Sequence, residues 1–271
     1  MRVALFQIAS PDHESLAARL HRVDHAIGRE SGLRAVDLLV LPELWNVGYF
    51  AFDDYPAMSE SLTGPTVTAA RDWAAALHIS VHLGSIVEID ELGRLYNTSV
   101  VVAPDGSVRT TYRKVHVFGY GSREQELLTP GTTVAVDPVA GVPTGIATCY
   151  DLRFPELFRS LTDAGAELLA VCAAWPAARL DHWRLFTSVR AVEQQSWMLA
   201  CNAVGEQQGV ALGGHSRIVD PWGEVLVEAG ADEGFLFADL DPTLPQRVRA
   251  EFPALADRRW PGTGSTSAEG S

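Results

Sequence analysis

The most informative stretch of the sequence reads Gly145-Ile146-Ala147-Thr148-Cys149-Tyr150-Asp151-Leu152-Arg153-Phe154-Pro155-Glu156. Residues 142–149 form an apolar run that predicts a buried strand, and Pro155 suits the first turn of a helix expected over 154–164. A thiol at such a turn is exposed to reactants, and a helix N-terminus with a nearby cation favours its thiolate. Cys149 is therefore a candidate nucleophile, with a buried structural cysteine as the alternative.

The other two cysteines lie in different surroundings. Cys172 and Cys201 are inside apolar runs, which is typical of small core residues. Three cysteines without regular spacing predict no disulfide framework. His116 could form a thiol–imidazole pair with Cys149, but its position two residues after Lys114 favours a structural hydrogen bond.

Two further strand ends carry charged side chains. Glu43 follows the apolar run 38–41 and Pro42, where a low dielectric would raise its pKa and allow it to act as a base. Lys114, the only lysine among 21 basic residues, ends another strand and could act as a fixed cation for an oxyanion. The alternatives are a solvated glutamate and an edge-strand lysine that deters aggregation.

Short β-forming runs alternate with helical periods along the chain, which predicts an α/β fold of sheets covered by helices. Strands are expected over residues 3–8, 37–41, 80–89, 95–103, 108–112, 134–137, 142–149, 167–172, 197–202, 213–219, 224–229 and 234–240. Helices are expected over residues 14–30, 66–78, 154–164, 181–194 and 242–250. No linker or internal repeat divides the chain, so we expect one domain over residues 1–260 and a flexible Gly/Ser-rich tail over 261–271.

The composition excludes several classes of protein. The chain has 271 residues, 47% of them hydrophobic, and a net charge of −13, which argues against nucleic acid or an anionic membrane as the main partner. No apolar run is long enough to cross a bilayer, and the N-terminus does not look like a signal peptide, so we expect a cytoplasmic protein. No residue cluster has zinc spacing and no glycine-rich phosphate loop is present, so we expect no metal and no cofactor.

Five segments, in the same order and with family-like gaps, resemble the nitrilase superfamily of carbon–nitrogen hydrolases. They cover residues 41–49, 112–116, 149–156, 190–195 and 214–223. This resemblance extends over about residues 2–260 and implies a four-layer αββα sandwich. It also implies pairing into an αββααββα dimer, so we expect at least a homodimer.

The resemblance also implies a set of site residues. Glu43 would be the general base, Lys114 the stabiliser of the oxyanion and Cys149 the nucleophile. The backbone N–H of Tyr150 would be the second oxyanion donor. Lysine suits this place better than arginine, because its charge is concentrated at one point.

Many members of the superfamily carry a second glutamate beside the site. Glu124 occupies that register here, and Glu126 is the alternative. Gly119 stands where an Asp is common, so the loop around it departs from the usual pattern. Tyr49 and Trp175 are expected to line the acyl pocket and to limit it to small or slender acyl groups.

The sequence around the nucleophile, Cys149-Tyr150-Asp151, resembles the amidase branch rather than true nitrilases, which usually have Cys-Trp-Glu. It implies hydrolysis of a small non-peptide amide to a carboxylate and ammonia through a thioester on Cys149. The alternatives are an N-carbamoyl-amino-acid hydrolase, a nitrilase or, less favoured, a non-catalytic member. Arg153 could bind a substrate carboxylate or form a structural ion pair at the helix start.

Overall fold

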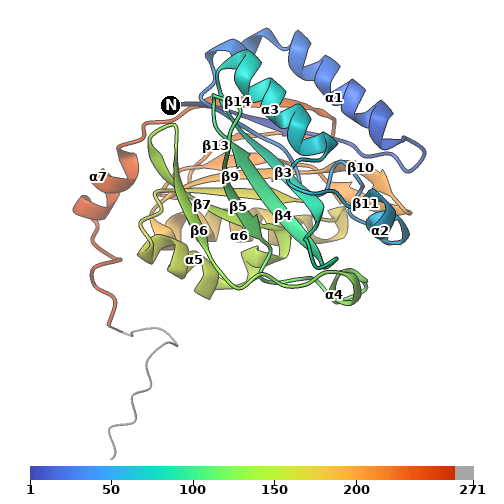
Figure 1. Cartoon of the computed structure of the whole chain (residues 1–271). Coiled ribbons are helices and arrows are strands. Elements are labelled where there is room, and N and C mark those ends of the chain that lie inside the picture. Colours follow the sequence, from blue (N-terminus) through green and yellow to red (C-terminus); the bar gives the residue numbers. More distant parts are fainter. Residues whose placement is uncertain (260–271) are drawn as a thin grey trace, which may run out of the picture.

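The computed structural model describes residues 1–259 and shows a four-layer sandwich (Figure 1). Helices α1 (Leu16–Arg29) and α3 (Pro65–Leu77) cover one sheet, and helices α5 (Pro155–Asp163) and α6 (Leu180–Gln194) cover the other. The two sheets pack against each other between these helix layers. This arrangement confirms the predicted α/β class and the αββα order of layers.

Each of the two large sheets has six strands. The order in the first is β14 (Gly234–Asp239), β1 (Arg2–Gln7), β2 (Leu38–Val40), β3 (Ser80–Ile89), β4 (Leu95–Val102) and β5 (Val108–Arg113). The order in the second is β13 (Val225–Glu228), β12 (Arg217–Val219), β9 (Trp197–Asn202), β8 (Leu168–Ala173), β7 (Val142–Thr148) and β6 (Ala135–Val139).

The central strands of each sheet are parallel, and this positions the site. Strands β1, β2 and β3 run parallel in the first sheet, as do β7, β8 and β9 in the second. Parallel strands end at the same edge of their sheet, where loops commonly carry functional groups. At this edge the N–H of Glu43, after β2, donates to the carbonyl of Ala173 in β8 at 3.4 Å. The two sheets therefore meet where β2 and β8 end.

Local sequence signals explain the main helices. The hydroxyl of Ser15 accepts a hydrogen bond from the Ala18 N–H at 3.3 Å and caps α1, whose Val23 and Ile27 are buried. Helices α3 and α5 each have a proline at the first turn, where its missing N–H costs no hydrogen bond. Apolar side chains spaced three or four residues apart then face the sheets.

The structure differs from the expected elements in the last third of the chain. The strand expected over 213–219 is interrupted, because Gly214 and His215 have φ values of 58° and 52° and only Arg217–Val219 pairs in the sheet. A hairpin of β10 (Val204–Gln207) and β11 (Val210–Gly213) was not expected.

Short helices also connect the strands. The sequence did not indicate α2 (Tyr55–Met58) or α4 (Glu124–Leu127). Helix α7 (Leu244–Glu251) overlaps the helix expected over 242–250, beginning two residues later and ending one residue later. The tail expected over 261–271 lies outside the described residues.

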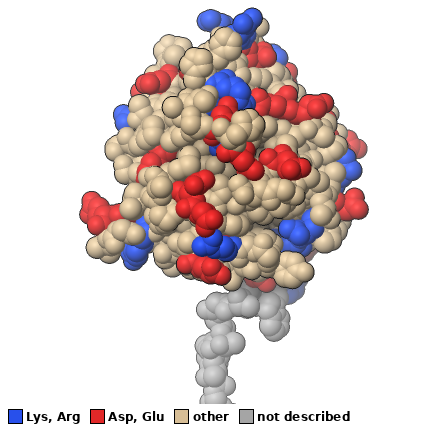
Figure 2. Space-filling view, turned by 90° about the vertical axis from the view of Figure 1, so that its right-hand side faces the viewer, with Lys and Arg blue, Asp and Glu red and all other residues tan. Residues whose placement is uncertain are grey.

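The surface view gives the distribution of charge on one face of the molecule. Acidic and basic side chains are interspersed there, and no continuous basic stripe crosses this face (Figure 2). Within residues 1–259, no helix combines the length and apolar character that a membrane span requires.

Candidate active site

The structure brings together the three side chains that the sequence singled out. Glu43 lies three residues after β2, Lys114 follows β5 directly, and Cys149 follows β7 directly. All three are buried, and Glu124, at the start of α4, lies with them. Glu43, Lys114, Glu124 and Cys149 are the candidate catalytic residues, and we refer to them as the catalytic cluster.

Lys114 forms the centre of the catalytic cluster. Its ammonium group donates to Oε1 of Glu43 at 2.8 Å and to Oε1 and Oε2 of Glu124 at 2.9 Å each. The side chains of all three residues have no solvent exposure. A compact ammonium can contact both carboxylates at once in this closed space, which supports the lysine preference inferred from the sequence.

Asn97 also contacts both carboxylates, although the sequence did not identify it. Its Nδ2 donates to Oε1 of Glu43 at 2.8 Å and to Oε1 of Glu124 at 2.9 Å. Asn97 lies in the interior of β4 and is fully buried. Asparagine is depleted in strands, so an amide within the strand expected over 95–103 was a usable signal.

Burial dominates the electrostatics of the cluster. It raises the pKa of Glu43, against the opposing effect of Lys114, and the nearby Glu124 carboxylate raises it further. Burial alone would lower the pKa of Lys114, but the carboxylates of Glu124 and Glu43 outweigh it and hold that pKa well above its usual value. Glu43 is therefore suited to accept a proton, and Lys114 to remain a cation.

Cys149 is more buried than its position at a turn indicated. The residue is only 8% exposed, and burial, followed by the Glu43 carboxylate, raises the pKa of its thiol well above the usual value. Lys114 acts in the opposite direction but does not outweigh them. These effects favour the protonated thiol, and the neighbouring Glu43 carboxylate is placed to accept its proton.

The backbone around Cys149 is held in an unusual conformation. Cys149 has a φ of 48° and opens a 3₁₀ helix (Cys149–Arg153) rather than α5 itself. The carboxylate of Asp151 accepts from the Thr148 N–H at 2.9 Å, and the Thr148 side chain in turn accepts from the Asp151 N–H. This reciprocal cap fixes the turn. Tyr150 lies in the first turn, where a backbone N–H has no acceptor within the helix.

His116 contacts Asp151 rather than the thiol. Its Nδ1 lies 2.7 Å from Oδ1 of Asp151, and its ring stacks on Phe154 with centroids 3.8 Å apart. The structure therefore gives His116 the structural hydrogen bond that the sequence favoured over a thiol–imidazole pair.

The two candidate second glutamates have different surroundings. Glu124 accepts from the Phe118 N–H at 2.7 Å and from the Tyr49 hydroxyl at 3.1 Å. Glu126 is exposed and lies 3.6 Å from Arg123. Only Glu124 of this pair belongs to the catalytic cluster.

A glycine sets the path of the loop that carries Glu43. Gly84 in β3 has a φ of 80°, and a Cβ at this position would lie 1.8 Å from the carbonyl oxygen of Pro42. The pairing of β3 with β4 is irregular here, between His82 and Ser85. The loop after β2 can therefore lie directly on the β3 backbone.

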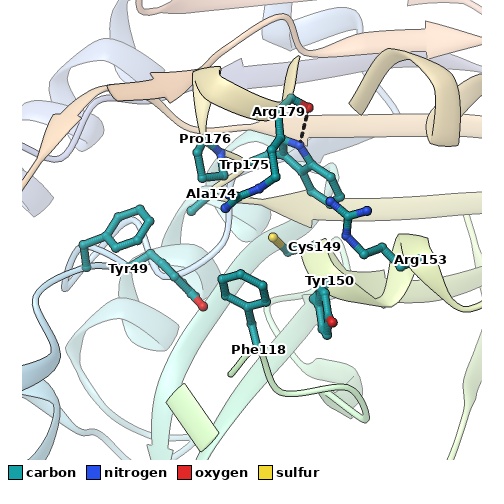
Figure 3. Close-up of a pocket in the computed structure, with 10 residues that line it drawn as sticks. Tyr49, Phe118, Cys149, Tyr150, Arg153, Ala174, Trp175, Pro176 and Arg179 are labelled. Carbon is teal, nitrogen blue, oxygen red and sulfur yellow. Dashed lines mark hydrogen bonds between the residues drawn. The ribbon is translucent and has the colours of Figure 1, made fainter. Parts of the chain in front are cut away.

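A pocket opens onto the Cys149 sulfur (Figure 3). Its empty volume is about 320 Å³ when the open solvent at its mouth is counted. Its lining comprises Tyr49, Phe50, Phe118, Cys149, Tyr150, Arg153, Ala174, Trp175, Pro176 and Arg179. Tyr49 and Trp175 were expected to line it. Aromatic rings make up much of the wall, which suits a small, slender acyl group.

Two arginines bring positive charge to this pocket. The Arg153 guanidinium lies over the Trp175 ring at 5.0 Å, and that of Arg179 over the Phe118 ring at 5.6 Å. Within residues 1–259, neither guanidinium has a carboxylate within 4 Å. The ion pair considered for Arg153 is therefore not formed, and no motif in the sequence indicated Arg179.

This geometry can support acyl transfer. It combines a thiol at a tight turn, a buried carboxylate that can accept a proton, and a buried ammonium beside them. In the described part of the chain, no group of three or more His, Cys, Asp or Glu side chains is arranged to hold a metal ion.

Comparison with known proteins agrees with this geometry. The family model described as "Carbon-nitrogen hydrolase" matches residues 2–250. A 2-oxoglutaramate amidase of Paenarthrobacter nicotinovorans is 37% identical, over 97% of this chain and 92% of that protein.

Solved structures extend the comparison. Saccharomyces cerevisiae Nit3, a member of branch 10 of the nitrilase superfamily, has a TM-score of 0.87 and 31% identity, covering 96% of this chain and 97% of its own. An amidase from Nesterenkonia sp. AN1, with an acrylamide adduct on its active-site cysteine, has a TM-score of 0.79 and 26% identity, covering 94% and 99%. The chain belongs to the carbon–nitrogen hydrolase family of the nitrilase superfamily.

Proposed function

We propose that this protein hydrolyses a short non-peptide amide that carries a carboxylate at its far end, such as 2-oxoglutaramate, releasing ammonia. The observation that carries the substrate class is the pair of guanidinium groups, Arg153 and Arg179, facing the pocket of Cys149 without a carboxylate partner in residues 1–259. A substrate carboxylate would supply the missing partner through charge-assisted hydrogen bonds. The name of the Paenarthrobacter relative supports the same class.

The first half of the reaction forms a thioester. The Cys149 sulfur attacks the amide carbonyl carbon while Glu43 takes the thiol proton. Negative charge develops on the carbonyl oxygen, and the Lys114 ammonium and the Tyr150 N–H stabilise it. Glu43 then gives its proton to the nitrogen, the C–N bond breaks, and ammonia leaves.

The second half releases the acid. Water takes the place of ammonia, and Glu43 removes its proton as the oxygen attacks the thioester carbonyl. The C–S bond breaks, the proton returns to the Cys149 sulfur, and the carboxylic acid product leaves. Glu124 does not take part in proton transfer in this scheme; it holds the Lys114 ammonium in place through two hydrogen bonds.

A substrate panel tests the proposal. We expect ammonia release from 2-oxoglutaramate or glutaramate to exceed that from valeramide, which has a similar chain without the carboxylate. Cys149→Ala should abolish release, and Cys201→Ala, which removes a thiol buried in β9, should retain it. Full activity of Cys149→Ala would refute the mechanism, and a preference for valeramide would refute the substrate class.

The same panel separates the two related activities. N-carbamoyl amino acids also carry a carboxylate, but their hydrolysis releases carbon dioxide together with ammonia. A nitrilase would release ammonia from nitriles, which contain no amide group. Faster turnover of either class than of the amides would replace the proposed function.

We also propose that the protein forms a homodimer through the outer face of α6. Leu185 and Val192 are 57% and 48% exposed on this helix. Val192 lies against Gly223, and the neighbouring Trp222 packs near Phe252 with ring centroids 6.2 Å apart, so the apolar patch is continuous. Light scattering should give a mass twice that of one chain, and the mass measured for Leu185→Glu should be lower. A monomeric wild type would refute the proposal.

A further inference from the structure

Asn97 holds three members of the catalytic cluster at once. Its two amide hydrogens are used by the carboxylates of Glu43 and Glu124, at 2.8 Å and 2.9 Å. Its backbone carbonyl accepts from the Lys114 N–H at 2.8 Å. Within residues 1–259, only the Lys114 side chain also donates to both carboxylates. Asn97 therefore has the contacts of a second, neutral bridge between the two glutamates.

The orientation of this amide follows from the charges around it. Reversing the amide would place its oxygen against two carboxylates, which would repel it. In the orientation found, Oδ1 is buried without a hydrogen-bond partner. An unpaired buried acceptor is destabilising, so the two contacts of Nδ2 must compensate for it. The amide is thus arranged to serve the carboxylates.

The charge balance of the cluster shows why a neutral donor matters. Two ionised carboxylates and one ammonium leave a net negative charge in a space closed to water. Such a cluster tends to take up a proton on one carboxylate. Amide hydrogen bonds favour the ionised form without adding a positive charge that would compete with Lys114 for the oxyanion.

We propose that Asn97 is a positioning residue that keeps the Glu43 carboxylate ionised and fixed beside Cys149. This rests on the proposed function, in which Glu43 is the base. The titratable groups around the Glu43 carboxylate are Lys114, Glu124, Cys149, Tyr49, Tyr55 and Cys172. The Ala174 N–H also donates to its Oε2, at 3.0 Å. None of these groups is itself replaced in an Asn97 variant, so a change in the pH profile can be assigned to the amide that Glu43 and Glu124 lose.

Asn97→Leu removes both donors at similar volume. We expect the acid limb of kcat/KM to move to higher pH by roughly one unit, with turnover partly recovered at alkaline pH and KM little changed. Asn97→Ser keeps one hydroxyl donor and should move the acid limb less. This variant replaces Asn97→Leu in the test if the leucine variant folds poorly. Thr98→Val is the matched control, because it removes a donor to Glu88, at 2.6 Å, one residue along the same strand.

A second readout does not depend on amide turnover. The rate at which iodoacetamide alkylates Cys149 also depends on Glu43 as the base, so its acid limb should move in the same direction in Asn97→Leu. An equal loss of kcat/KM and of alkylation rate at every pH, with the acid limb of both pH profiles unmoved, would overturn the proposal. Asn97 would then be a packing residue. If wild type alkylates normally but hydrolyses no amide, the proposed function fails while the role of Asn97 is still tested.

Discussion

The Tyr112 hydroxyl donates a hydrogen bond of 2.8 Å to the buried carboxylate of Asp151. Tyr112 lies two residues before Lys114, and Asp151 lies two residues after Cys149. The same carboxylate also accepts from the N–H of His116, at 3.1 Å. One buried carboxylate therefore connects the segment that carries the cation to the turn that carries the nucleophile.

Tyr112→Phe should weaken this connection. The variant leaves a buried carboxylate with one donor fewer, which costs about 1–3 kcal/mol of unfolding free energy. We also expect a lower kcat with little change in KM, because the distance between Lys114 and Cys149 is less well fixed. Tyr96→Phe removes a similar tyrosine–aspartate contact, 3.3 Å to Asp90, away from the site and should keep its kcat. Equal kcat values for the two variants would contradict this role.

Lys114→Arg should abolish turnover while the chain still folds. The guanidinium keeps the charge but is too wide to contact both carboxylates in the space that Nζ occupies. Loss of one oxyanion donor alone reduces the rate by roughly 10²–10³-fold. Ammonia release and thermal melting measure the two effects. Arg113→Lys is the reciprocal change at the preceding residue. It affects a partly exposed ion pair with Glu88, and this variant should remain active. Wild-type turnover in Lys114→Arg would remove it from the mechanism.

Arg153→Met and Arg179→Met should raise KM for the carboxylate-bearing amide. Each variant loses a charge-assisted hydrogen bond, a loss of about 1.5–3 kcal/mol or roughly 10–100-fold in binding. Turnover of valeramide should change little, because it has no carboxylate to lose. Arg109→Gln, which breaks an exposed pair with Asp137, is the control. A similar loss for both substrates would show that the arginines shape the pocket only.

His82 should make the fold sensitive to mild acid. Burial lowers its pKa from 6.5 to about 4, and neither ring nitrogen has a hydrogen-bond partner. As the pH falls below 6.5, the unfolded chain binds a proton that the folded chain does not, so stability is lost until the pH reaches the folded pKa. Between about pH 7 and about pH 5, this lowers the free energy of unfolding by about 2 kcal/mol.

Urea unfolding of His82→Leu at these two pH values checks the effect. The variant should lose less stability than wild type over the interval, whereas His21→Gln, at an exposed position on α1, should behave like wild type. Parallel pH dependences of wild type and His82→Leu would exclude His82 as the source.

The sequence was sufficient for the layers of the fold and for the central residues of the cluster. Apolar runs, helical periods and five ordered segments depend on local patterns, which the sequence shows directly. The burial of Cys149 was not predicted because it depends on distant segments, including Glu43 and the loop after β8. A turn motif alone does not show how much water reaches the thiol.

Two other site residues depend on distant partners. Asn97 acts on Glu43, 54 positions away, so its role exists only once β2 and β4 lie in one sheet. Arg179 ends a short 3₁₀ helix (Ala177–Arg179) between β8 and α6, which is too short to show a periodic pattern in the sequence. The interruption at Gly214 and His215 was missed because the residue types of 213–219 do not by themselves show left-handed backbone.

The bare backbone of Gly84 has a consequence for how this site can change over time. With a Cβ at this position only 1.8 Å from the Pro42 carbonyl, any larger residue would push the chain that carries Glu43 outward. Such a variant would keep every catalytic atom and still lose its base. Catalysis therefore requires glycine at a position that contacts no substrate. A relative that lacks glycine there must hold its glutamate by a different loop path.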